Sequence, residues 1–245
     1  FLTNLIQPDI LTAIILNKHK TREKMKLLSL FGSVLVLLSI TSNLFAQEKS
    51  MNPEEAAKNV MSRLLGNNAN SVLFKYSESE DGNDFYEYEA KNGKVYIKGS
   101  SAISMCRGFY DYLRANNLGM IGWTGPQLKA PKQWPNAPRT KVTTPFKWRH
   151  AYNVVTAGYT TPYWTWERWE QELDYLALHG YNMPMAPVAT EAIAQRVWKK
   201  LGLTQQEIDK FYTGPAHLPW QRMGNIRNVD GPMPQEWHKD QINLT

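Results

Sequence analysis

The sequence predicts an α/β protein, with a small N-terminal α/β domain followed by the truncated start of a (β/α) barrel of the TIM type. Helical and alternating strand patterns share residues 50–130. After residue 146, strand-like and helix-like segments alternate, which implies parallel strands joined by helices. About 95 residues follow Arg149, whereas a complete barrel takes roughly 250. We therefore expect the chain to be the N-terminal fragment of a longer protein.

The composition is that of a globular protein, with 42% hydrophobic and 12% aromatic residues among 245. The net charge of +6 is unevenly distributed: residues 1–46 carry five Lys or Arg and two acids, which leaves 23 against 20 in the rest. Residues 47–245 therefore have a net charge of +3, and they contain no basic run and no RNA-binding motif. We do not expect them to bind nucleic acid. The single cysteine, Cys106, excludes an internal disulfide.

Residues 25–46 have the pattern of a secretory signal peptide. A basic start is followed by an apolar run and by the small residue Ala46 at the expected cleavage site. Residues 1–24 would then be an upstream extension. Residues 27–46 are also just long enough to span a membrane, so an uncleaved anchor is the alternative. Either way we expect an exported protein (periplasmic, cell-surface or secreted), with no stable membrane span once the signal is cleaved.

The N-terminal domain is expected over residues 50–130. It would begin with a helix capped by Asn52 and ended by Gly66. Strands are predicted over Ser71–Tyr76, Asp84–Lys91 and Lys94–Lys98, with Asn92-Gly93 as the hairpin turn between the last two. A second helix follows Ser100 and places Cys106 on its apolar face, as a buried thiol. Residues 131–145, within a proline-rich stretch, are predicted to be a surface linker.

The barrel start is expected over residues 146–245. Strands are predicted over Phe146–Val155 and Tyr181–Val188. A helix from Trp166 to Gly180 would place Trp166, Trp169, Leu173 and Leu176 on one face. Its acids are expected to form a solvated face: Glu167, Glu170, Glu172 and Asp174. A further helix is predicted over Thr190–Lys200, and a capping box at Thr204–Glu207 predicts another that runs to Tyr212.

Active sites of such barrels lie where strands end, which draws attention to Asn153 and Glu191. Asn153 could bind a sugar hydroxyl or acetamide, or cap a turn. Glu191 could be a site carboxylate, or a favourable charge in the first turn of a helix. Six of the nine tryptophans lie between Tyr152 and Trp237. Such density suits a sugar site, but a hydrophobic core also explains most of these rings, and composition alone favours the core.

Other catalytic chemistry is not indicated. Glycoside hydrolysis needs two carboxyl groups across the sugar, and no pair here would be presented together by a barrel. The histidines lack metal-ligand spacing, and neither a phosphate-binding loop nor a nucleophile elbow occurs. We therefore expect no cofactor, no metal and no catalytic residue within this chain. Gly224 and Asn225 could form a tight loop close to a ligand, or an ordinary turn.

The chain resembles the α-N-acetylglucosaminidases, glycoside hydrolase family 89, from about Gly99 to Gln241. The resemblance rests on segments in the family's order: Tyr152-Asn153-Val154, Arg168-Trp169-Glu170, Leu176-Ala177-Leu178, Gln195-Arg196-Val197, Leu201–Gln205, Phe211–Ala216 and Arg222-Met223-Gly224-Asn225. The sequence departs from the family's pattern over Ala186–Glu191 and at Val155. Pro184 and Pro187 also fall in the second predicted strand, where a missing N–H is costly.

The resemblance implies a small α/β domain, a (β/α) barrel and a later helical domain. It also implies retaining hydrolysis of terminal α-linked N-acetylglucosamine from glycans, through two glutamates farther along the barrel than this chain extends. By this resemblance, Asn153 and Trp220 match positions that line the family's sugar pocket. Met223, Gly224 and Asn225 match the family's loop that follows Trp220. The alternative is a non-catalytic carbohydrate-binding or surface protein.

Overall fold

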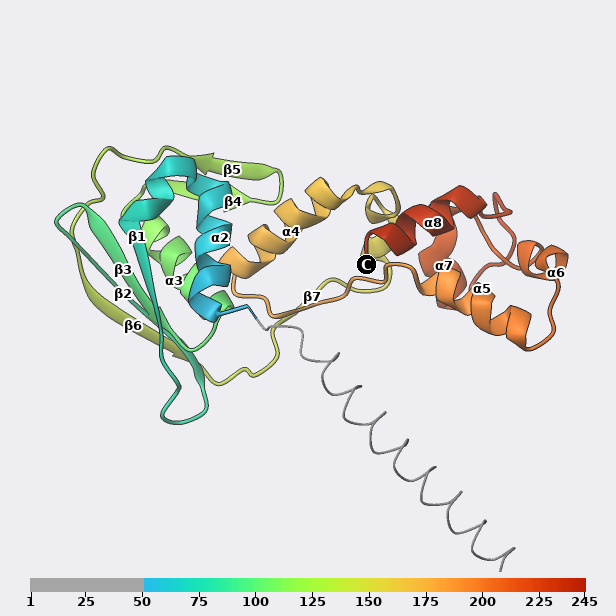
Figure 1. Cartoon of the computed structure of the whole chain (residues 1–245), viewed down its shortest axis with the longest axis horizontal. Helices are drawn as coiled ribbons and strands as arrows, with labels where there is room; N and C mark the ends of the chain where they lie inside the picture. The colour runs from blue at the N-terminus through green and yellow to red at the C-terminus, as the bar shows by residue number, and fades with distance from the viewer. Residues whose placement is uncertain (1–50) are drawn as a thin grey trace, which may run out of the picture. The chain divides into compact units, whose positions relative to one another are not determined.

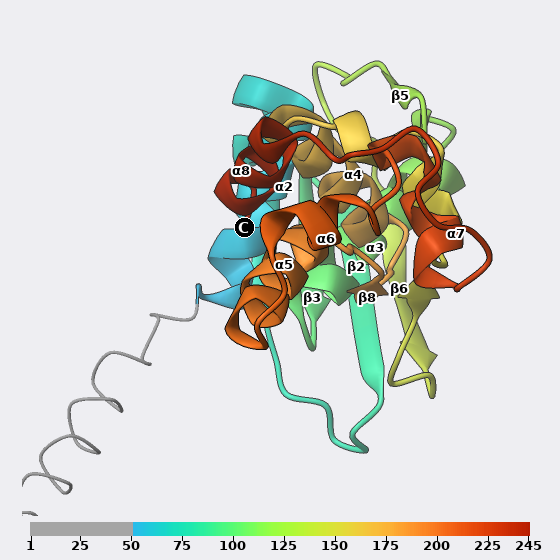
Figure 2. The same cartoon turned by 90° about the vertical axis from the view of Figure 1, so that its right-hand side faces the viewer.

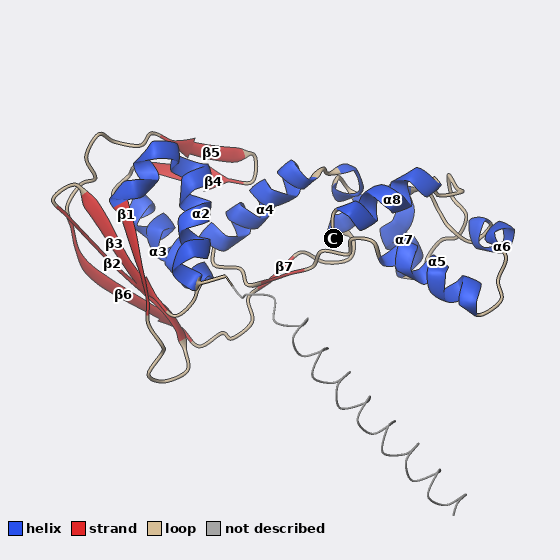
Figure 3. Cartoon of the chain, viewed as in Figure 1, coloured by secondary structure: helices blue, strands red, loops and turns tan. Residues whose placement is uncertain are grey.

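The computed structural model describes residues 51–245. The predicted upstream extension (1–24) and signal peptide (25–46) lie outside the described residues. Within 51–245, no helix combines the length and the apolar character needed to cross a membrane. Most strands belong to the earlier part of the described chain, and the later part is mostly helical (Figure 3).

A four-stranded sheet is the centre of the N-terminal domain. Its strands are β1 (Val72–Tyr76), β2 (Asp84–Lys91), β3 (Lys94–Gly99) and β6 (Ala137–Thr144). The order across the sheet is β1-β3-β2-β6, with β1 parallel to β3 and the other pairs antiparallel. Asn92 and Gly93 both have positive φ, as a tight hairpin turn requires. The three strands and the turn predicted for residues 71–98 are thereby confirmed.

Two helices cover one face of this sheet: α2 (Pro53–Leu65) and α3 (Ala102–Ala115) (Figure 1). The Asn52 side chain accepts a hydrogen bond from the Glu54 amide, which confirms it as the cap of α2. Ser101 and Ser104 form a reciprocal capping box at the start of α3. Cys106 is buried between these layers, as predicted, and burial raises its thiol pKa to about 12.

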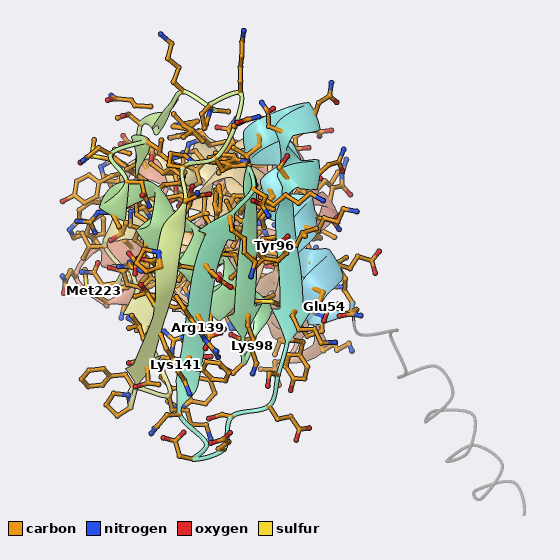
Figure 4. The ribbon with its side chains drawn as sticks, turned by 90° about the vertical axis from the view of Figure 1, so that its left-hand side faces the viewer. Glu54, Tyr96, Lys98, Arg139, Lys141 and Met223 are labelled. Carbon is orange, nitrogen blue, oxygen red and sulfur yellow. The ribbon has the colours of Figure 1, made fainter. Side chains whose placement is uncertain are left out.

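The other face of the sheet is open to solvent. Strand register places Lys75, Lys98, Glu87 and Lys141 in one row across the four strands. Figure 4 shows this face, with Tyr96, Lys98, Arg139 and Lys141 labelled. Alternation along β3 explains it, because Val95 and Ile97 point into the core while Tyr96 and Lys98 point outward.

The prediction of a linker over residues 131–145 is wrong for Ala137–Thr144, which forms edge strand β6. An edge strand tolerates Pro138 because one of its sides needs no backbone donors. The first prolines of the same stretch fall near a short hairpin, β4 (Gly119–Gly122) and β5 (Gly125–Leu128). Trp123 lies at the turn of this hairpin.

The barrel start has the predicted parallel pairing but much shorter strands. β7 (His150–Ala151) pairs in parallel with β8 (Met183–Pro184). The strands predicted over 146–155 and 181–188 are therefore wrong in extent. Pro184 and Pro187 have no backbone N–H to donate, and the Arg149 amide just before β7 donates to the Asn182 side chain at 2.8 Å. Within residues 51–245, the strands do not close into a barrel.

Helix α4 (Trp166–Leu178) follows β7, and its buried and exposed faces differ from those predicted. Trp169 and Leu176 are buried, but Trp166 and Leu173 are exposed. The acids do not form the expected solvated face, because Glu172 is fully buried. It is held there by Arg168 at 2.7 Å and by the Trp123 indole N–H. A buried carboxyl group needs such partners in either protonation state.

The remaining helices are short and follow β8. They are α5 (Thr190–Lys200), α6 (Gln205–Asp209), α7 (Leu218–Arg222) and α8 (Gln235–Asn243) (Figure 2). Four 3₁₀ turns accompany them and the earlier elements: η1 (Gly66–Ser71), η2 (Thr156–Gly158), η3 (Thr161–Tyr163) and η4 (Pro215–His217). The capping box of Thr204 and Glu207 is confirmed, although α6 ends before the predicted Tyr212.

The N-terminal domain and the barrel start pack against each other within one compact unit, Asn52–Thr245. Ala177 and Leu178 of α4 join the hydrophobic core of the sheet domain. Arg63 of α2 binds both carboxylate oxygens of Asp174 at 2.6 Å. Arg149 binds Asp84 of β2 at 2.5 Å. These ion pairs fix β7 and α4 against the sheet domain.

Candidate functional site

The loop after β7 begins with a strained residue. Tyr152 has φ 69°, a left-handed conformation that is uncommon for a bulky side chain. Ala189, the residue before α5, has φ 59° and is buried. The two follow the carboxyl ends of neighbouring parallel strands, where barrel sites lie. Backbone strain of this kind concentrates at functional sites.

Asn153 follows directly and organises the loop. Its Oδ1 accepts hydrogen bonds from the amides of Val155 (3.0 Å) and Thr156 (3.1 Å), and from the Thr156 hydroxyl (3.2 Å). The predicted turn-capping role is therefore observed. The side-chain Nδ2 takes no part in these three bonds, and Asn153 is exposed. A role for that donor in sugar binding stays a prediction.

This loop packs on α7, which carries Trp220. A Cβ placed on Gly158 would lie 2.4 Å from Pro219 Cγ and 3.1 Å from Trp220 Cζ3, so only glycine permits this approach. The Tyr159 ring meets the Trp220 ring edge-on, with centroids 6.1 Å apart. Trp220 is half-buried. The structure thus brings the Asn153 loop and Trp220 together, although they are distant in sequence.

Glu191 lies at the start of α5 and is 5% exposed. Its Oε1 accepts from Arg222 Nε at 2.7 Å, and its Oε2 accepts from Arg222 Nη2 at 2.8 Å. The Thr190 hydroxyl also donates to Oε2 at 3.0 Å. Both oxygens are therefore occupied, and the pair joins the first turn of α5 to the end of α7. A substrate-binding role for Glu191 stays a prediction.

Met223, Gly224 and Asn225 form a tight turn directly after α7. The Gly224 amide donates to Gln221 O and the Asn225 amide to Trp220 O, each at 2.9 Å. Gly224 has φ 80°, which favours glycine. All three residues are exposed, so the turn presents backbone and side chains beside Trp220.

The predicted residues therefore group around α7, with Asn153 reaching the group through its loop. Sequence reasoning missed Arg222, Tyr152 and Gly158 as contributors. Arg222 lay within one of the segments that carry the resemblance, but neither a backbone strain nor a close approach is visible in residue types. In the part of the chain that the structure describes, no three His, Cys, Asp or Glu side chains are grouped so as to hold a metal ion.

The fold therefore consists of a small α/β domain followed by the opening elements of a (β/α) barrel, with the candidate residues at strand ends and around α7. Two successive family models match it: the alpha-N-acetylglucosaminidase (NAGLU) N-terminal domain over residues 55–136, and the tim-barrel domain of the same family over residues 149–245. The chain belongs to the alpha-N-acetylglucosaminidase family, glycoside hydrolase family 89.

Individual relatives agree with this assignment. Alpha-N-acetylglucosaminidase from Homo sapiens is 43% identical over 152 residues, which cover 62% of this chain and 20% of the human protein. A family 89 glycoside hydrolase from Clostridium perfringens, solved with PUGNAc, is similar with a TM-score of 0.73 and 30% identity. The match covers 78% of this chain and 22% of the Clostridium perfringens chain. A Clostridium perfringens variant solved with its substrate GlcNAc-alpha-1,4-galactose gives the same values. The chain thus spans about a fifth of the length of these relatives.

Proposed function

We propose that the chain is the N-terminal part of an exported, retaining glycoside hydrolase that removes terminal α-linked N-acetylglucosamine from glycans. Membership of the family supports the substrate class, and one relative was solved with GlcNAc-alpha-1,4-galactose as its substrate. The hydrophobic pattern of residues 25–46 supports export. In this proposal the two catalytic glutamates belong to later barrel strands.

The observation that carries the proposal is the packing of the Asn153 loop against α7. It places Trp220, the Met223–Asn225 turn and the strained strand end at Tyr152 in one region. An indole ring next to amide donors suits a sugar, because the ring contacts C–H groups and the amides bind hydroxyl or acetamide oxygens. This chain then supplies one wall of the sugar pocket.

The test is release of the aryl group from an aryl α-N-acetylglucosaminide. A longer chain that includes the rest of the barrel should hydrolyse it with net retention at the anomeric carbon, and residues 47–245 alone should not. Hydrolysis by residues 47–245 alone would disprove the assignment of catalysis to later strands. Binding without hydrolysis by the longer chain would favour the alternative, a non-catalytic carbohydrate-binding protein.

Export needs a separate measurement. The protein should be recovered outside the cytoplasm of its host with an N-terminus at Gln47, as determined by mass spectrometry. Recovery of a form that keeps residues 25–46 in the membrane fraction would favour the uncleaved anchor, and recovery in the cytoplasm would contradict export.

A further inference from the structure

A cavity of about 890 Å³ lies between the sheet domain and α4. Its walls come from α2, the β4–β5 hairpin, the loop before α4 and α4 itself, and Figure 1 shows the hairpin turn directed toward α4. This volume falls in the range of sites that take small ligands, roughly 300–1,000 Å³. The same loop that carries Asn153 contributes Thr160 and Trp164 to the cavity.

Two indole rings are held in fixed positions at this cavity. Trp123 is 50% exposed, yet its Nε1–H donates to both oxygens of buried Glu172, at 3.0 and 2.9 Å. The Arg168 guanidinium lies 4.0 Å from the Trp164 ring centroid and 5.9 Å from that of Trp123. Arg168 is itself paired with Glu172 at 2.7 Å. The exposed face of Trp123 is thus preorganised, which lowers the entropic cost of stacking a ligand on it.

The charges around the cavity disfavour an anionic ligand. Arg63 is bound by Asp174 and lies 3.5 Å from Glu170, and Arg168 is bound by Glu172. Three acidic side chains line the cavity against these two arginines. The exposed lining groups on α4 include the amide of Gln171 and the carboxylate of Glu167, which has a hydrogen bond with the Thr165 side chain and keeps further acceptor capacity. Carboxylate and amide groups beside an indole face suit the hydroxyls and C–H surface of a neutral sugar.

We propose that this cavity is a second carbohydrate-binding site, which takes a neutral sugar unit stacked on Trp123. It is separate from the wall formed by α7, and binding there requires no catalytic group. The site would hold a part of a glycan other than the residue being cleaved, or hold the protein on a glycan surface. Because it is defined by its own residues, it can be tested whether or not the proposed hydrolysis is correct.

The experiment is a titration of the 245-residue chain with N,N′-diacetylchitobiose and with lactose. Ligand-observed NMR detects the binding at each step of the titration. We expect saturable binding of at least one of these neutral probes. Trp123→Ala should raise the Kd about tenfold or more, as loss of a central aromatic contact does. The matched control is Trp148→Ala, which removes a Trp that is 62% exposed outside the cavity and should leave the Kd unchanged.

Two further variants keep the test decisive if Trp123→Ala disturbs the hairpin. Trp123→Phe keeps a stacking ring and should bind more weakly than the unmodified chain, but more tightly than Trp123→Ala. Gln171→Ala changes only an exposed helix position and should also weaken binding. Circular dichroism of each variant establishes that the fold is retained.

The inference fails if neither neutral probe binds saturably, or if an anionic disaccharide containing glucuronate binds more tightly than both. It also fails if Trp220→Ala abolishes binding while Trp123→Ala does not, because the sugar then lies at the α7 wall. That last result would leave the proposed function intact and remove only the second site.

Discussion

Arg222 at the end of α7 and Glu191 in the first turn of α5 form a two-point ion pair in which both carboxylate oxygens are bound, at 2.7 and 2.8 Å. Arg222 Nη2 also donates to the carbonyl of Pro187 at 3.2 Å. These bonds connect the segment after β8 to the helix that carries Trp220. The position of the proposed sugar wall therefore depends on a charged pair whose carboxylate is buried and whose guanidinium is partly exposed.

Breaking this pair should destabilise the fold strongly. Arg222→Met leaves Glu191 buried without its cation, and loss of one partner of a buried pair costs about 3–5 kcal/mol. Urea unfolding followed by circular dichroism measures the change. Glu236→Gln in α8 breaks an exposed pair with Lys239 and should cost less than about 0.5 kcal/mol. Equal effects of the two substitutions would contradict a structural role for the Arg222 pair.

The contact between the Asn153 loop and α7 should tolerate no side chain at Gly158. Gly158→Ala would push a methyl group against Pro219 and the Trp220 ring, and overpacking of this kind costs about 1–3 kcal/mol. We also expect a changed near-ultraviolet circular dichroism signal, because Trp220 moves. In Gly122→Ala the new methyl group would have 3.8 Å to its nearest neighbour and should leave that signal unchanged. An unaltered aromatic spectrum in Gly158→Ala would show that the contact does not position Trp220.

Local signals in the sequence predicted the elements whose cause is local. Asn52, Asn92-Gly93 and the Thr204–Glu207 box were correct because a cap or a tight turn depends on a few adjacent residues. The predictions were wrong where contacts with segments distant in sequence determine the burial or the pairing of a residue. Glu172 looked like one of several surface acids, because the approach of Trp123 from the N-terminal domain cannot be read from the residues around it.

In the candidate site, too, the sequence indicated individual residues but not their contacts with distant segments. Residue types and the family resemblance pointed to Asn153 and Trp220, which the structure brings together through Gly158. The partner of Glu191 could not be predicted, since Arg222 is 31 positions away and only folding places it there. β6 was missed for a related reason: prolines indicate a loop, and they are tolerated in a strand only where its position at the edge of a sheet is known.

Stability should depend on pH through Glu172. Burial raises the pKa of this carboxyl from 4.5 to about 7, and the Trp123 hydrogen bond opposes that rise. Between pH 4.5 and 7 the folded protein then keeps a proton that the unfolded chain has released. Stability therefore falls as the pH rises through this window, by roughly 3 kcal/mol at most, and the Glu172 contribution is constant outside it.

Urea unfolding at a series of pH values measures this dependence. Glu172→Gln should flatten it, because the amide resembles the protonated carboxyl and can still accept from Trp123. Glu167→Gln, on the exposed surface of the same helix, should leave the slope between pH 4.5 and 7 in place. A stability that rises with pH in the unmodified protein across this range would contradict the assignment to Glu172.

In the proposed enzyme, α7 and the Asn153 loop form one wall of the pocket for N-acetylglucosamine. The most direct measurement is kcat/KM for an aryl α-N-acetylglucosaminide in the longer chain, compared between Trp220→Ala and Trp166→Ala. Trp166 is 51% exposed on α4 and serves as the matched control. We predict a loss of about tenfold or more for Trp220→Ala, through weaker binding of the sugar, and no loss for Trp166→Ala. Equal kcat/KM values for Trp220→Ala and the unmodified enzyme would contradict the claim.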